Sequence, residues 1–112
     1  MYKAYNLFSD NRRYPRKKAQ IEIFLQVGIH LKCSGTIQDI SLKGLRIIVP
    51  ELFAFFKPQQ AHIFQNAELA VFLPKEDLSV KGSIIWLNAI DKEIGVSIQG
   101  TTNNSKWKIF CK

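Results

Sequence analysis

The sequence predicts an all-β domain, built as an antiparallel barrel or sandwich. About six short segments alternate apolar and polar residues with a period of two, which is typical of half-buried strands. Turns join these segments, and no helical pattern alternates with them as an α/β fold would require. At 112 residues, the chain fits one domain. A closed barrel is favoured, because closure leaves no exposed strand edge.

The first two strands are expected at residues 19–27 and 31–40. In "AQIEIFLQV" the apolar residues at alternate positions share one face: Ile21, Ile23, Leu25 and Val27. Gly28 lies in the expected turn after this strand. In the second strand, "LKCSGTIQDI", Gly35 is expected to mark a bulge or kink.

A third strand at residues 45–50 is expected to end at Pro50, because proline cannot donate a ladder hydrogen bond. Residues 51–67 then break the strand rhythm and predict a short helix or packed loop. We expect the phenylalanines of this segment to cap one end of the barrel rather than to dock a partner: Phe53, Phe55, Phe56 and Phe64.

Three more strands are expected at residues 68–74, 78–90 and 93–100, with a bend at Gly82. Asn103 or Asn104 is placed to cap a short helix through "SKWKIFCK". The two tryptophans, Trp86 and Trp107, are expected to anchor the core or pack a helix rather than to form stacking platforms.

The surplus positive charge is concentrated at the N-terminus. Residues 1–18 hold six Lys or Arg and one Asp, a local charge of +5, while residues 19–112 hold ten basic and eight acidic residues. We therefore divide the chain into a flexible basic leader, residues 1–18, and a barrel domain, residues 19–112. The leader predicts an anionic partner, either a nucleic acid, a nucleotide or an acidic membrane surface, although a solvated tail has the same composition.

Several functional classes lack their usual residues. Cys33 and Cys111 form no CxxC pattern, and His30 and His62 have no neighbours at metal-ligand spacing. No nucleophile is paired with a base, so we expect neither an enzyme nor a resident cofactor. No apolar run reaches the length of about 20 residues that spans a membrane, and no signal-peptide pattern opens the chain. We expect a soluble cytoplasmic protein with reduced thiols.

Two short stretches carry the candidate chemistry. In "RRYPR", Arg12 and Arg16 are four residues apart and Arg13 lies beside the first of them. Guanidinium groups bind phosphate with two prongs and stack on flat bases. Pro15 disfavours a helix before it, so the segment is expected to be extended or turned. One alternative is a solvated basic linker. Another pairs Arg13 with Lys17, but a lysine lacks the planar two-pronged group of an arginine.

The second stretch is "DISLKG", residues 39–44. The carboxylate of Asp39 can accept from the N1–H and exocyclic amine of a guanine. Ser41 can donate to a phosphate or to its own turn, and Gly44 permits a positive φ or a close approach of ligand to backbone. An ordinary turn between two strands uses the same residue types.

In combination, an RxxxR leader directly before the first strand and DxSxxG at the end of the second resemble the paired motifs of the PilZ domain family. The resemblance runs from about Asn11 to about Gly100 and includes "GTIQDIS", "VFLP" and the pair "GSIIW" and "IGVSI". It implies a six-stranded antiparallel β-barrel that binds the bacterial second messenger cyclic di-GMP. It also implies the ligand-binding residues, with arginines on the phosphates and guanine and the DxSxxG residues on the base edge and backbone: Arg12, Arg13, Arg16, Asp39, Ser41 and Gly44.

The resemblance predicts a non-catalytic receptor that passes the second-messenger level to a partner protein in motility, biofilm formation or polysaccharide export. We expect the ligand to order residues 8–18 against the barrel and so to create a surface for that partner. Two alternatives stay open. One is a small basic barrel that binds single-stranded nucleic acid, although the aromatic residues are not interleaved with the basic ones as a stacking track requires. The other is an adaptor that docks on proteins without ligand.

Overall fold

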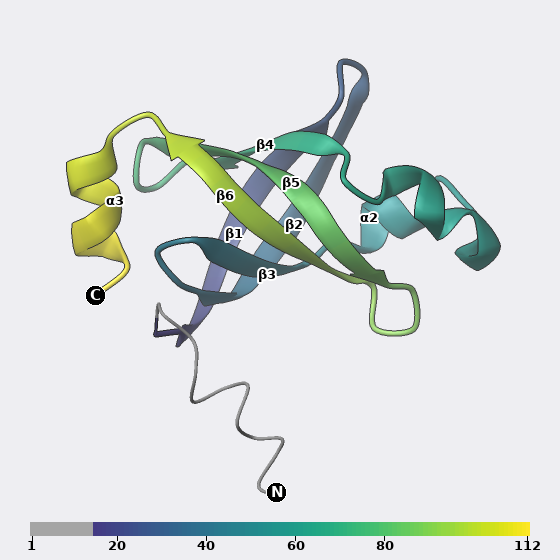
Figure 1. The fold of residues 1–112 in the computed structure, drawn as a ribbon, viewed down its shortest axis with the longest axis horizontal. Helices are drawn as coiled ribbons and strands as arrows, with labels where there is room; N and C mark the ends of the chain where they lie inside the picture. The colour runs from purple at the N-terminus through teal and green to yellow at the C-terminus, as the bar shows by residue number, and fades with distance from the viewer. Residues whose placement is uncertain (1–14) are drawn as a thin grey trace, which may run out of the picture.

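Six antiparallel strands close into a barrel in the structure, a computed structural model that describes residues 15–112. The order around the barrel is β1-β2-β3-β6-β5-β4, as Figure 1 shows. The expected all-β barrel is confirmed. The strands are β1 (Lys17–Val27), β2 (Leu31–Ile40), β3 (Gly44–Ile48), β4 (Glu68–Leu73), β5 (Leu78–Asn88) and β6 (Glu93–Thr101).

The barrel interior is filled by the alternating apolar residues of the strands. Ile37, Ile47, Val71, Val80 and Ile94, one from each of five strands, have no exposed surface. Complete burial of such side chains contributes roughly 1.5–3 kcal/mol each. The interior is therefore a packed core, and any ligand must bind on the outer face or at an end of the barrel.

One end of the barrel is covered by α2 (Pro50–Phe53) and the 3-10 helix η1 (Pro58–Phe64). Strand β3 already ends at Ile48, and Pro50 begins α2 instead of ending the strand. Proline suits the first helical turn, because the amide hydrogen that it lacks has no partner there in any helix.

Three of the four phenylalanines of this segment pack against the core. The ring centroids of Phe53 and Phe56 are 5.3 Å apart, and those of Phe56 and Phe64 are 4.7 Å apart. The expected cap is confirmed for these three residues. It is wrong for Phe55, which lies 61% exposed in the bend after α2.

The other end is covered by α3 (Asn104–Phe110), which lies at the opposite side of the barrel from α2 in Figure 1. The helix begins as expected, because the side chain of Asn103 accepts a hydrogen bond from the backbone N–H of Lys106. Trp107 points inward and is 2% exposed, which confirms its prediction as an anchor.

Of the two glycines at which an irregular strand was expected, Gly35 differs from the expectation and Gly82 agrees with it. Gly35 is not a bulge; it lies where a Cβ atom would come 2.8 Å from the backbone oxygen of Ile48, so glycine permits close approach of β3. The bulge of β2 lies at Gln38 instead, because Ile37 pairs with Ile47 and Asp39 with Arg46. Gly82 does lie beside a register shift of the β5–β6 pair.

Candidate functional site

The DxSxxG stretch forms the tight turn between β2 and β3. The Ser41 amide donates to the Gly44 carbonyl oxygen at 2.9 Å, and the Gly44 amide donates to the Ser41 Oγ at 3.0 Å. The Ser41 hydroxyl donates in turn to the Gly44 carbonyl oxygen at 3.3 Å, and the residue is 5% exposed. Ser41 therefore shapes the turn. Of the glycines in the described residues, only Gly28 has a positive φ, so a left-handed backbone is not the reason for a glycine at position 44.

Asp39 lies on the outer face of the barrel because of the bulge at Gln38. Cys33 and Ile37 point inward, and strict alternation would place Asp39 inward as well. The extra residue in β2 reverses the alternation, so that Ile40 is buried and the Asp39 carboxylate faces outward.

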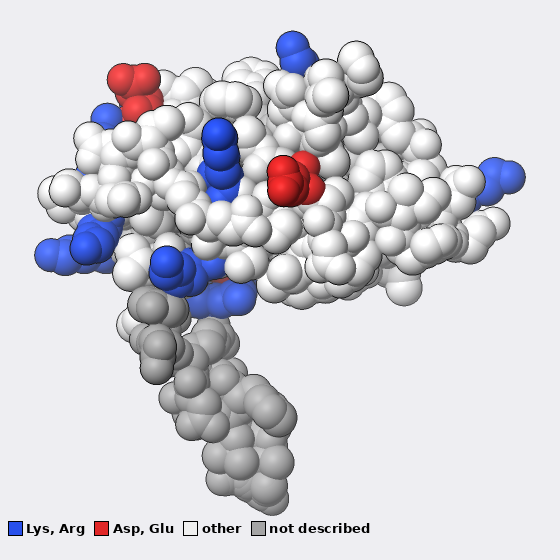
Figure 2. Space-filling view, turned by 45° about the horizontal axis from the view of Figure 1, so that its top comes forward, with Lys and Arg blue, Asp and Glu red and all other residues white. Residues whose placement is uncertain are grey.

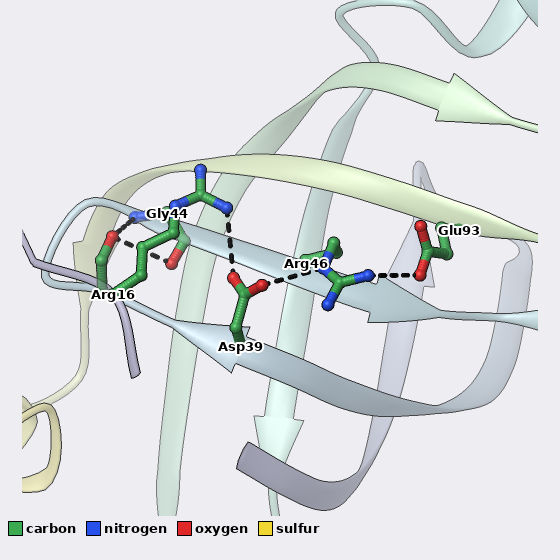
Figure 3. Close-up of polar contacts among 6 residues, drawn as sticks. Arg16, Asp39, Gly44, Arg46 and Glu93 are labelled. Atoms are coloured by element: carbon green, nitrogen blue, oxygen red, sulfur yellow. Dashed lines mark hydrogen bonds and ion pairs between the residues drawn. The ribbon is translucent and has the colours of Figure 1, made fainter. Parts of the chain in front are cut away.

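The Asp39 carboxylate is held by two arginines. Arg16 Nη1 lies 3.1 Å from Oδ1, and Arg46 Nε lies 2.8 Å from Oδ2 (Figure 3). Arg46 also reaches the carboxylate of Glu93 on β6, with 2.6 Å between Nη1 and Oε2. The hydrogen bond to Asp39, together with the nearby negative charges, raises the pKa of Arg46 above its ordinary value. Arg46 therefore stays charged at any physiological pH.

Arg16 brings the second half of RxxxR to the DxSxxG turn. Besides its ion pair with Asp39, its Nη2 lies 3.8 Å from where a Cβ atom on Gly44 would stand. Arg12 and Arg13 lie outside the described residues. The structure thus joins Arg16, Asp39, Ser41 and Gly44, four of the six predicted site residues.

A cavity of about 190 Å³ opens beside this cluster. Its wall includes Arg16, Ser41, Lys43, Gly44, Trp86 and Gly95. Asp39 adjoins the cavity through Arg16 and does not line it. The volume is below the roughly 300–1,000 Å³ of pockets that enclose a drug-sized ligand. The cavity is therefore too small to enclose a whole ligand of that size.

Trp86 is a site residue that the sequence analysis did not predict. A bulge at Ile85 shifts β5 so that Ile84 pairs with Val96 and Trp86 pairs with Gly95. A Cβ atom on Gly95 would overlap the indole, so glycine lets the ring lie against the backbone of β6. Trp86 lines the cavity, and its prediction as a core anchor is wrong because the bulge reverses the alternation. In the sequence, the signal for this placement of Trp86 is Gly95, whose missing side chain leaves room for the indole.

Helix α3 contacts both halves of the site. The Trp107 indole Nε1 donates to the carbonyl oxygen of Leu42 at 3.1 Å, and Cys111 Sγ lies 3.6 Å from the carbonyl oxygen of Ser41. Lys17, next to Arg16, donates from Nζ to the carbonyl oxygens of Phe110 at 2.8 Å and Lys112 at 3.0 Å. This helix therefore supports the turn and the start of β1 together.

The charge distribution agrees with an anionic ligand. Figure 2 shows several Lys and Arg side chains on the side of the molecule that carries α3 and the start of β1. Within residues 15–112, no three His, Cys, Asp or Glu side chains gather as a metal site would require. No described helix combines the length and apolar character needed to cross a membrane.

Comparison with known protein families assigns residues 10–110 to the PilZ domain. The chain belongs to the PilZ domain family. This match includes both motifs and all six strands of the barrel. The expected family is confirmed. No curated protein matches the chain.

Solved structures share the PilZ fold at low sequence identity. The PilZ domain of CeSA from a cellulose-synthesizing bacterium superposes with a TM-score of 0.63 at 15% identity, over 86% of this chain and 93% of that one. The Bacillus subtilis inhibitor of motility, MotI/DgrA, gives 0.58 at 13% identity, over 90% and 49%. MrkH of K. pneumonia, solved in complex with c-di-GMP, gives 0.58 at 14% identity, over 89% and 50%. The present chain thus spans about half the length of MotI and MrkH.

Proposed function

We propose that this PilZ domain is a non-catalytic receptor for cyclic di-GMP. The observation that carries the proposal is the meeting of the two motifs, with Arg16 bonded to Asp39 and beside the Ser41–Gly44 turn. A guanine edge offers two adjacent N–H donors, which suits a carboxylate, and the two phosphates suit arginine. The structural neighbour MrkH, solved with c-di-GMP, supports the same ligand class.

The geometry suggests how the ligand is divided over the surface. In this proposal one guanine enters the cavity that Trp86 lines, where the aromatic ring offers a stacking face. Arg16 and, by the motif, Arg12 and Arg13 hold the phosphates and the guanine faces. Asp39 accepts from a guanine edge, Ser41 keeps the turn in shape, and Gly44 lets the ligand approach the backbone. The receptor then passes the signal to a partner protein in motility, biofilm formation or polysaccharide export.

Calorimetric titration with cyclic di-GMP tests the proposal. We expect saturable binding at or below tens of micromolar and a clear loss of affinity in Arg12→Ala and in Arg16→Ala. Lys81→Ala is the control, because it removes one positive charge from the exposed surface of β5. Absence of binding at tens of micromolar contradicts the ligand, as does an unchanged affinity in both arginine variants. Salt-sensitive binding of oligonucleotides with indifference to cyclic di-GMP would favour a nucleic-acid-binding barrel.

A further inference from the structure

The two arginines on Asp39 come from different parts of the fold. Arg16 precedes β1, whereas Arg46 is in the middle of β3. Arg46 faces Asp39 directly in the β2–β3 register, and its other end is bound to Glu93. Asp39, Arg46 and Glu93 thus form a chain of ion pairs across β2, β3 and β6 (Figure 3).

The carboxylate has room for Arg46 and a guanine together. Two carboxylate oxygens offer about four lone-pair sites. Arg46 donates one hydrogen, from Nε, to Oδ2, and the contact of Arg16 is with Oδ1. The guanidinium of Arg16 presents the same kind of planar N–H edge as guanine does. Arg16 therefore occupies an oxygen that a guanine edge needs and is the partner that exchanges, while Arg46 can stay in place.

The orientation of Asp39 matters, because its carboxylate can accept hydrogen bonds from both N–H donors of a guanine edge only if its plane is fixed. Hydrogen bonds prefer a donor–hydrogen–acceptor angle above about 150° and weaken steeply below about 120°. The Asp39 side chain follows a bulge and is 14% exposed, while the side chain of Glu93 is 13% exposed. The two carboxylate side chains are therefore largely shielded from water, and Arg46 between them is 28% exposed, so their geometry is more restricted than that of a fully exposed pair.

We infer that Arg46, fixed by Glu93, is a positioning residue that orients the Asp39 carboxylate for both donors of a guanine edge and so sets base specificity. This inference rests on the proposed function. A fixed carboxylate gains a second bond from guanine that it does not gain from hypoxanthine, which has N1–H but lacks the exocyclic amine. A carboxylate that is free to turn makes one good hydrogen bond to N1–H of either guanine or hypoxanthine. Arg46 therefore sets the ratio of the affinity for the guanine ligand to that for the hypoxanthine ligand.

The experiment compares cyclic di-GMP with cyclic di-IMP, its hypoxanthine analogue, by calorimetric titration. We expect the unaltered protein to prefer cyclic di-GMP by roughly tenfold or more, the cost of one unmade hydrogen bond in a shielded site. In Arg46→Gln that preference falls toward unity, and in Glu93→Gln it falls by a smaller factor. Lys81→Gln, with the same change of charge as Arg46→Gln, is the matched control and keeps the full preference.

The outcomes separate this inference from the function on which it rests. Equal weakening of both ligands in Arg46→Gln, with the preference intact, overturns the positioning role and indicates a direct phosphate contact or a general structural effect. Absence of cyclic di-GMP binding in the unaltered protein overturns the proposed function itself, and the inference with it. If Arg46→Gln does not fold, Arg46→Lys keeps the charge without the fork, and an unchanged preference there contradicts the inference.

Discussion

The two ends of the barrel are closed in different ways. At one end, α2 and η1 cover the core through apolar contacts, with Leu52 fully buried and Phe53, Phe56 and Phe64 packed around it. At the opposite end, where α3 lies in Figure 1, the core is covered through Trp107, and the same residue donates a hydrogen bond to the carbonyl oxygen of Leu42 in the DxSxxG turn. Both ends stabilise the barrel, but only the α3 end is bonded to the predicted site residues among those described.

Because of this difference, we expect changes at the α2 end to affect stability alone and changes at the α3 end to affect both stability and ligand binding. A change under α2 removes buried apolar area and leaves the Ser41–Gly44 turn untouched. A change under α3 removes buried area and also releases the carbonyl oxygen of Leu42, inside the motif. The following three experiments test that contrast.

The largest effect is expected from emptying the core beneath each end. Trp107→Ala should lower the free energy of unfolding by about 3–5 kcal/mol and Leu52→Ala by about 2–5 kcal/mol, because both side chains are buried. At a temperature where both variants are folded, only Trp107→Ala should also weaken cyclic di-GMP binding. Urea unfolding followed by circular dichroism measures the first quantity and calorimetry the second. Equal losses of affinity in the two variants would contradict the contrast, and Trp107→Phe keeps most of the bulk if the alanine variant is unfolded.

A smaller effect is expected from the lysine that ties β1 to α3. Lys17→Gln removes the ammonium group bonded to the carbonyl oxygens of Phe110 and Lys112. Because the ammonium group is exposed, we expect the free energy of unfolding to fall by less than about 1 kcal/mol. The affinity for cyclic di-GMP should fall roughly two- to fivefold. Lys106→Gln is the control, since it makes the same charge change on an exposed position of α3. The coupling is refuted if the two variants bind cyclic di-GMP alike.

The smallest effect concerns the two free thiols, Cys33 near α2 and Cys111 beside α3. Burial raises the pKa of both thiols; Glu51 adds to the rise at Cys33, whereas Lys17 opposes it at Cys111. Their contribution to stability is complete below the ordinary thiol value of about 8.5 and is lost as the pH rises through the higher folded values.

We therefore expect the free energy of unfolding to decline above about pH 8.5, in reducing buffer. Cys33→Ala should flatten that decline, and Cys111→Ala should flatten it less, because Lys17 already favours the thiolate there. Urea unfolding at several alkaline pH values measures both slopes. Slopes in both variants equal to that of the parent protein would show that other groups cause the decline.

The period-two pattern predicted the fold well because strand alternation is local. Strand β2 spans the residues expected for it, and the other strands begin or end within two residues of expectation. The pattern fails where an extra residue enters a strand. Gln38 and Ile85 are such residues, and the side chains that follow them, Asp39 and Trp86, lie on the outer face near the site.

Short motifs predicted part of the site, whereas its other residues are known only from how the strands pair. Arg16, Asp39, Ser41 and Gly44 follow from two short stretches whose spacing is visible in the chain. Arg46 and Glu93 resemble any outward-facing charged residues of a strand. Their ion pair depends on how β3 and β6 align, which is a non-local property that no single stretch encodes.

The placement of the two tryptophans gives the molecule an optical reporter of its own. Trp86 lines the cavity, whereas Trp107 is 2% exposed on the inner face of α3. A collisional quencher in solution therefore reaches the indole of Trp86 more readily than that of Trp107. Under the proposed function, a guanine stacked on Trp86 alters that emission directly, whereas Trp107 reports the packing of α3 against the barrel, so both can be followed in one unlabelled sample.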